Sequence, residues 1–166
     1  DRVIRDDLRL GPQGTLWAYG WNAVVACGWD LVDVHRYVSE AHHEVYPLDD
    51  GSFWTMIHRA TVFDAYPADY DELLPVPPAV VVEDNPLVHI AADGTTLVDW
   101  PLAARLDRGR ISWDGLSANT NGSYDWVHAN AVIPDGEGGL VVSLRNQDAV
   151  VRLDAEGELD WILGDP

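Results

Sequence analysis

The residues best suited to chemistry stand in two short phrases near the end of the chain. The first is Y-D-W-V-H-A-N at residues 124–130, and the second is L-V-V-S-L-R-N-Q at residues 140–147. Because side chains alternate along a strand, His128 and Asn130 are expected on the same side of an inner strand. Arg145 ends an apolar run that predicts the neighbouring, buried strand. A histidine facing an arginine makes a cationic, hydrogen-bond-donating spot, which favours an anion.

The overall charge of the chain makes such a cationic spot unusual. The 166 residues include 28 acidic side chains and 10 basic ones, for a net charge of −18, and every base is arginine. Such a surface repels the phosphates of nucleic acids and of anionic membranes, so neither is expected as a partner. No apolar run approaches the roughly 20 residues of a membrane-spanning helix, so membrane insertion is not expected.

The elements that must position these groups repeat along the chain. Residues 90–100 (I-A-A-D-G-T-T-L-V-D-W) and 153–161 (L-D-A-E-G-E-L-D-W) each predict two strands around an acidic-glycine turn. Upstream of each, residues 42–58 and 128–144 also match one another, again as strand, turn and strand. One unit is therefore four short antiparallel strands, opened by a histidine and closed by Asp-Trp, which is typical of a β-propeller blade.

The repeats predict an all-β fold in one partial β-propeller domain. Its expected parts are an incomplete blade and loop at about 1–40, a blade at 41–100, an inter-blade loop at 101–125 and a blade at 126–164. A short helical turn is expected at 102–106. Because propellers close with typically about four to eight blades, we expect the chain to be an interior fragment of a larger propeller or one protomer of an oligomeric ring.

The histidines and the arginine also allow structural interpretations. His128 could be a hydrogen-bonded structural residue, and Arg145 could tie blades together through a carboxylate. A metal site made by His42, His43 and His128 is not favoured, since no H-x-H or H-x₃-H spacing is present. No metal and no cofactor are therefore expected. His58 is expected on the surface or in a loop.

The phrases together resemble the arylsulfotransferase (aryl-sulfate sulfotransferase) family. The motifs that carry the resemblance are D-W-x-H-x-N at 125–130, S-x-R-x-Q at 143–147, W-I-L-G at 161–164 and, one blade earlier, H-H-E-x₃-L-x₂-G at 42–51. The resemblance covers roughly residues 40–166. One departure is that the family often has R-H-Q where this chain has Asn146 after the arginine.

The resemblance implies a six-bladed propeller that moves a sulfuryl group from an aryl sulfate ester to a phenolic acceptor, through a sulfated histidine and without a nucleotide donor. His128, Arg145 and His43 would hold the sulfuryl group, and His42 and Asn130 would contact the substrate. A gap-free alignment of the repeats pairs His42 with His128, whereas the family phrase selects His43. Since neighbouring strand residues face opposite ways, only one of these two histidines can face the pocket.

The resemblance further implies a periplasmic or extracellular protein. The family's nucleophilic histidine belongs to a Q-H-D-like phrase in the next blade, which would begin beyond Pro166. We therefore expect this chain to supply the anion-stabilising part of the site, to be inactive alone, and to pair with the remaining blades or with further copies. Two other functions stay open, a non-catalytic propeller that serves as a binding scaffold and hydrolysis with water as the acceptor.

Overall fold

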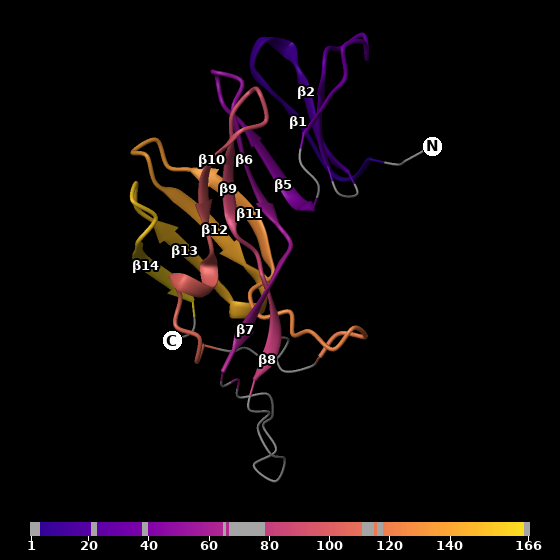
Figure 1. Cartoon of the computed structure of the whole chain (residues 1–166). Coiled ribbons are helices and arrows are strands. Elements are labelled where there is room, and N and C mark those ends of the chain that lie inside the picture. The colour runs from indigo at the N-terminus through magenta and orange to yellow at the C-terminus, as the bar shows by residue number, and fades with distance from the viewer. Residues whose placement is uncertain are drawn as a thin grey trace. The chain divides into compact units, whose positions relative to one another are not determined.

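The computed structural model describes residues 4–20, 23–37, 40–64, 66, 79–110, 115 and 118–164. Every regular element in these ranges is a β-strand or a short 3-10 turn, which confirms the predicted all-β class (Figure 1). The described strands form three four-stranded antiparallel sheets and one two-stranded sheet. Two compact units are distinguished, residues 1–58 with 86–100 and residues 59–85 with 101–166, and each is considered separately.

Each unit is built from strands and short 3-10 turns. Those of the first unit are β1 (Ile4–Leu10), η1 (Pro12–Gly14), β2 (Leu16–Gly20), β3 (Ala23–Cys27), β4 (His35–Tyr37), β5 (Ala41–Pro47), β6 (Phe53–Ile57), β9 (Leu87–Ile90) and β10 (Thr96–Trp100). Those of the second are β7 (Arg59–Phe63), β8 (Val80–Asp84), η2 (Leu102–Ala104), β11 (Ala129–Pro134), β12 (Leu140–Leu144), η4 (Arg145–Gln147), β13 (Ala149–Leu153) and β14 (Leu159–Gly164).

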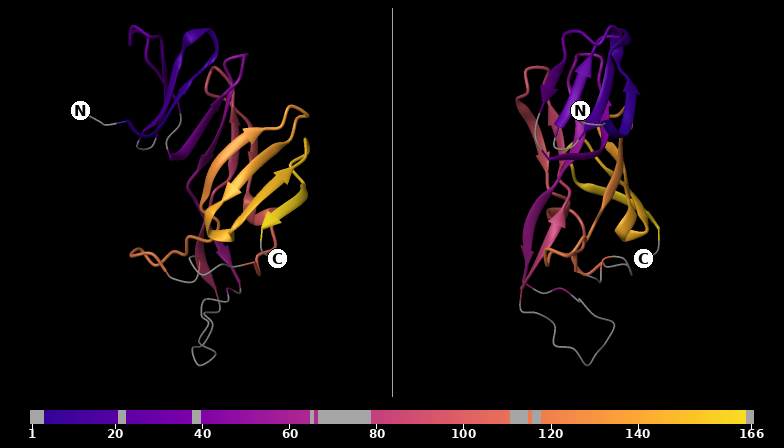
Figure 2. Two further views of the ribbon diagram at one scale, coloured as in Figure 1. Left: turned by 180° about the vertical axis from the view of Figure 1, so that it is seen from behind. Right: turned by 90° about the vertical axis from the view of Figure 1, so that its right-hand side faces the viewer.

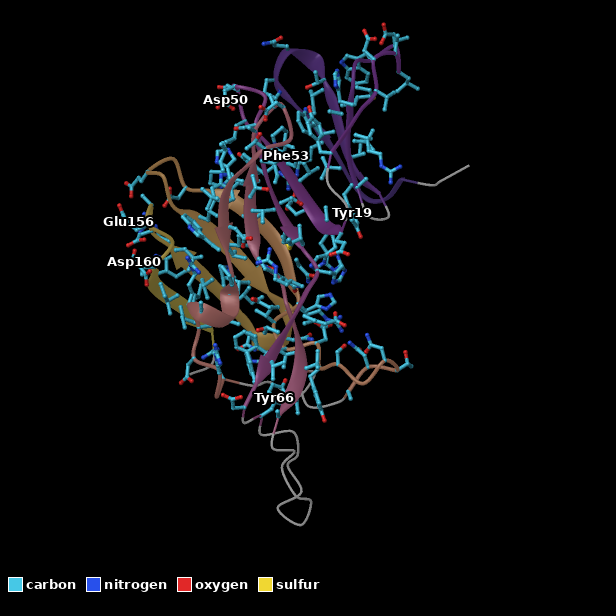
Figure 3. The ribbon with its side chains drawn as sticks, in the orientation of Figure 1. Tyr19, Asp50, Phe53, Tyr66, Glu156 and Asp160 are labelled. Atoms are coloured by element: carbon cyan, nitrogen blue, oxygen red, sulfur yellow. The ribbon has the colours of Figure 1, made fainter. Side chains whose placement is uncertain are left out.

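The first unit contains two four-stranded sheets, β1-β2-β3-β4 and β10-β9-β6-β5. The sequence predicts only an incomplete blade before residue 40, whereas β3 and β4 add a third and a fourth strand there. Trp17 and Tyr19 of β2 belong to the same buried core as Phe53 of β6. Figure 3 marks Tyr19 and Phe53. The centroids of the Trp17 and Phe53 rings lie 5.2 Å apart, so the aromatic side chains of both sheets form one core.

The blade expected over residues 41–100 is interrupted in the structure. Between β6 and β9 the chain forms a separate antiparallel hairpin, β7-β8, which belongs to the second unit. The remaining strands still pair in chain order as β5, β6, β9 and β10. An antiparallel meander of four strands is the arrangement of a propeller blade, so this sheet is consistent with the predicted propeller.

The second unit contains the uninterrupted meander β11-β12-β13-β14, coloured orange to yellow in Figure 2. Its turn after β11 needs glycine, because a Cβ at Gly139 would lie 2.4 Å from the backbone oxygen of Leu153. The turn η2 agrees with the helical turn predicted near residue 102, although residues 111–114, 116 and 117 of the expected inter-blade loop lie outside the described ranges. Within those ranges no helix is long and apolar enough to cross a membrane.

Candidate functional site

The segment 125–128, here called the His128 loop, enters the second unit's meander. The sequence places His128 in an inner strand, but β11 begins only at Ala129 and His128 precedes it with a φ of 45°. The register of β11 against β12 then shifts between Ala129 and Ala131. Because this bulge interrupts the alternation of side chains, the alternation argument that put His128 and Asn130 on one side does not hold.

The sequence predicts a buried strand at Arg145. In the structure Arg145 is instead the first residue of the 3-10 turn η4, and it is exposed. The strand β12 ends at Leu144, and the turn closes at Asp148, whose φ of 47° lies in the left-handed region. Strand alternation therefore does not apply to Asn146 either. Its side chain and that of Gln147 are 3% and 2% exposed and point into the unit.

The turn η4 binds the His128 loop through four successive backbone carbonyls. Two bonds come from backbone amides and two from the amide side chains of the turn. They are Arg145 N to His128 O (3.0 Å), Asn146 N to Val127 O (3.2 Å), Gln147 Nε2 to Trp126 O (2.6 Å) and Asn146 Nδ2 to Asp125 O (2.6 Å). The R-N-Q phrase thus holds the backbone of the D-W-V-H phrase at every residue.

Trp126 anchors the middle of the His128 loop in the core of the second unit. Its side chain is fully buried, and its Nε1 donates a 2.9 Å hydrogen bond to the backbone oxygen of Arg110. The Phe63 ring meets the indole edge-on, with centroids 5.0 Å apart. The guanidinium of Arg110 in turn donates to the backbone oxygen of Gln147 at 3.1 Å, so loop and turn share one anchor.

His128 is oriented by a carboxylate of its own loop. Its Nδ1 is bound to Oδ2 of Asp125, and about one-fifth of each side chain is exposed, 21% and 22% respectively. A carboxylate accepts a hydrogen bond from Nδ1–H and therefore fixes which ring nitrogen points elsewhere. Nε2 is the nitrogen that can approach a bound ligand, as acceptor when neutral and as donor when protonated.

Two amide oxygens near the same turn are buried and have no hydrogen-bond partner among the described residues. They are Oδ1 of Asn130, in the bulge of β11, and Oε1 of Gln147. Buried polar atoms are normally paired with protein or ligand groups or with ordered water. Asn130, predicted to contact substrate, therefore has a side-chain acceptor that no described group occupies.

The other predicted histidines lie in the first unit. His42 is 3% exposed, and its ring stacks on that of His58 with centroids 4.0 Å apart and planes 15° apart. His43 is partly exposed, has a φ of 60°, and meets His42 edge-on at 4.7 Å. A register shift between His42 and Val45 interrupts strand alternation here as well. The choice between His42 and His43 therefore does not follow from alternation, and the structure buries one and partly exposes the other.

Strand register identifies the positions that correspond between the two sheets. His58 N donates to Glu40 O at 2.9 Å, just as Arg145 N donates to His128 O. Glu40 and His128 both have positive φ and both precede the first strand of their sheet. His58 is therefore the equivalent of Arg145 and Glu40 that of His128, so the gap-free alignment of His42 with His128 is wrong.

His58, expected on the surface or in a loop, is exposed, and it takes part in a group of three imidazoles with His42 and His43. The sequence signal for this position is its distance from the preceding turn glycine. His58 follows Gly51 by the same number of residues as Arg145 follows Gly138. Within the described ranges, no group of three or more His, Cys, Asp or Glu residues is arranged to hold a metal ion.

The sequence was compared with known proteins and with models of protein families. No curated protein matches the chain. The family model described as Arylsulfotransferase (ASST) matches residues 30–166, a range that includes the His128 loop, η4 and the three imidazoles. Since this match spans far more than half of its length, the chain belongs to the arylsulfotransferase family.

Proposed function

We propose that the protein transfers a sulfuryl group from an aryl sulfate ester to a phenolic acceptor, and that this chain supplies groups that hold the sulfuryl oxygens. Family membership supports sulfotransfer as the class of reaction. The observation that carries the finer proposal is the joint placement of His128 and Arg145. One is oriented by Asp125, the other begins η4, and a backbone hydrogen bond joins them.

The chemistry of the transfer explains why a guanidinium and an imidazole are needed. A transferring sulfuryl group, like a phosphoryl group, spreads negative charge over three equatorial oxygens. Arg145 can donate two parallel hydrogen bonds to two of these oxygens, and Nε2–H of His128 can donate to the third. Donors held in place before the reaction stabilise this charge without reorganising, and such stabilisation commonly contributes more to the rate than any other single effect.

The proposed route uses two displacements at sulfur. In the first, a histidine nitrogen of the protein attacks the sulfur, the S–N bond forms, the S–O(aryl) bond breaks, and the departing phenolate takes up a proton. In the second, the acceptor's phenolic oxygen attacks the sulfur, the S–N bond breaks and the acceptor's proton is released. The sum is one aryl sulfate and one phenol exchanged for another pair, with no nucleotide consumed. The attacking histidine is proposed to lie in another blade.

Three further residue roles complete the proposal. His43 would hold the sulfuryl group and His42 and Asn130 would contact the substrate, as the family phrases predict. The partly exposed ring of His43 and the unpartnered Oδ1 of Asn130 support these roles. A location in the periplasm or outside the cell is part of the same proposal and rests on the family resemblance.

The function is tested by supplying the full-length protein with p-nitrophenyl sulfate and a second phenol. We expect the sulfated form of the second phenol in the product mixture, and a sulfated histidine peptide when the acceptor is omitted. Release of free sulfate at the same rate with and without the phenol would instead identify a hydrolase. Saturable binding of the ester with no turnover would identify a non-catalytic scaffold.

A further inference from the structure

We propose that Asp125 is a positioning residue for sulfotransfer, which holds the Nδ1–H group of His128 so that Nε2 is presented to the sulfuryl group. This inference rests on the proposed function and adds a residue whose role the reaction scheme leaves open. It is carried by the contact between Asp125 Oδ2 and His128 Nδ1 and by the way the backbone between them is fixed.

The chemistry of the pair favours this role. Both side chains are only about one-fifth exposed (21% and 22%), so water competes weakly for the bond. A carboxylate at Nδ1 selects the tautomer with its proton there and offsets positive charge on the ring. When Nε2–H donates to an oxygen that gains negative charge, Asp125 can therefore balance the imidazolium without any movement.

The backbone that carries the pair is held rigidly. The carbonyl of Asp125 is fixed by Asn146 Nδ2, and that of His128 by the Arg145 amide. His128 nevertheless has a φ of 45°, a conformation that costs energy for a residue with a side chain. Such a conformation persists where its surroundings impose it, and it is commonest at functional sites.

The groups around Asp125 leave His128 as the side chain for it to orient. Burial raises the pKa of Tyr66 well above its ordinary value, and charge on Tyr124 and Asp125 adds to the rise. Tyr66 therefore stays neutral, and its hydroxyl donates a 2.6 Å hydrogen bond to the backbone oxygen of Gly115. Arg145, the first residue of the adjoining turn η4, is proposed above to donate to the sulfuryl oxygens. His128 is thus the side chain that Asp125 is placed to orient.

The tautomer of His128 tests the geometry without any assay of activity. In the ¹⁵N-labelled full chain, we expect Nδ1 of His128 to carry a proton that is hydrogen-bonded to Asp125. Asp125→Ala should shift the ring toward the Nε2–H form, while Asp160→Asn, at the exposed edge of β14, should leave it unchanged (Figure 3). A ring of the unaltered chain that carries its proton on Nε2 and none on Nδ1 would overturn the inference.

Steady-state kinetics of the full-length protein test the role. Asp125→Asn should lower kcat by roughly 10–100-fold with little change in KM and should move the acidic limb of the pH–rate profile, while Asp125→Glu should recover part of the rate. Asp160→Asn should match the unaltered protein. If the unaltered protein transfers the group and Asp125→Asn has the same rate and pH profile, the positioning role is wrong. If the unaltered protein transfers nothing, the proposed function fails together with the role, whatever the tautomer.

Discussion

The sheet β5-β6-β9-β10 and the sheet β11-β12-β13-β14 share one register at the end of their second strands and carry different chemistry there. In the first, His58 binds the carbonyl of Glu40, and in the second Arg145 binds that of His128. The backbone arrangement is the same, down to the positive φ of the residue that accepts the bond. One sheet thus has an imidazole where the other has a guanidinium, and a carboxylate where the other has an imidazole.

The bulges that follow also differ in length. In the first sheet two residues, His43 and Glu44, stand between the strand pairs of His42 and Val45. In the second sheet Asn130 alone forms the bulge, and it lies one strand pair earlier, between the pairs of Ala129 and Ala131. The longer bulge provides one more side chain, and its Glu44, which is buried, forms an ion pair with the partly exposed Arg9 at 2.6 Å. The comparison teaches that the blade supplies equivalent positions and that bulges and turns decide which side chains reach a ligand.

The largest effect is expected at the position where the second sheet has a guanidinium and the first an imidazole. Arg145→Lys keeps the charge but loses the pair of parallel donors, so kcat/KM for sulfotransfer by the full-length protein should fall on the order of 10²-fold or more. Arg36→Lys, on the exposed strand β4, serves as the matched control and should have no effect. Arg145→Lys with a near-unaltered rate would remove the distinction drawn between the two sheets.

The next effect is on stability and concerns the turn that only the second sheet has. Gln147→Ala removes the donor to the buried carbonyl of Trp126, so the free energy of unfolding should fall by about 1–3 kcal/mol. Glu156→Ala, in the exposed turn between β13 and β14 (Figure 3), should change it by less than about 0.5 kcal/mol. Urea unfolding of both variants measures the difference, and equal midpoints would mean that η4 does not hold the His128 loop.

A smaller effect is expected in the first sheet. His58→Ala removes the ring that stacks on His42 and should lower the free energy of unfolding by about 0.5–1.5 kcal/mol. His58→Phe keeps an aromatic ring and should recover most of the loss. Thermal unfolding distinguishes the two variants, and an equal loss in both would show that stacking is not what His58 contributes.

The smallest effect is a pH dependence that arises from a histidine of the first sheet. His89 hydrogen-bonds Ser52 Oγ at 2.8 Å, and burial lowers its pKa below the ordinary value of 6.5, although the charge of Asp50 opposes the shift. The unfolded chain therefore binds the proton more readily than the folded protein does. The contribution of His89 to the free energy of unfolding should therefore be complete above pH 6.5 and should decline as the pH falls below it. In His89→Gln the slope between pH 7 and pH 5.5 should flatten, and an unchanged slope would assign it to other groups.

Much of the fold follows from the sequence because strands and turns are local. The acidic-glycine turns at residues 93–94 and 154–157 predict the hairpins β9-β10 and β13-β14, and the structure has both. The hairpin β7-β8 and the strands β3 and β4 are not evident from the sequence, because they match no repeat. The pairing of β7 with β8 also joins residues as far apart in the chain as Arg59 and Asp84.

The candidate site is less predictable for a physical reason. A motif identifies His128 and Arg145, but alternation assumes unbroken strands, and here both histidine phrases contain bulges. The turn η4 forms because the side chains of Asn146 and Gln147 bind backbone carbonyls 21 residues earlier in the chain. No local pattern contains that information, so Arg145 is predicted in a strand and found in a turn.

The central claim is that His128, oriented by its own loop, holds the sulfuryl group during transfer. The most direct measurement compares the full-length protein with its His128→Ala variant, following the sulfated phenolic acceptor by mass spectrometry and checking the fold by thermal unfolding. We predict a loss of transfer on the order of 10²-fold with an unchanged unfolding temperature, since the ring is partly exposed and one donor is lost. Transfer at the unaltered rate would contradict this account, and a variant that no longer folds would contradict it by identifying His128 as a structural residue.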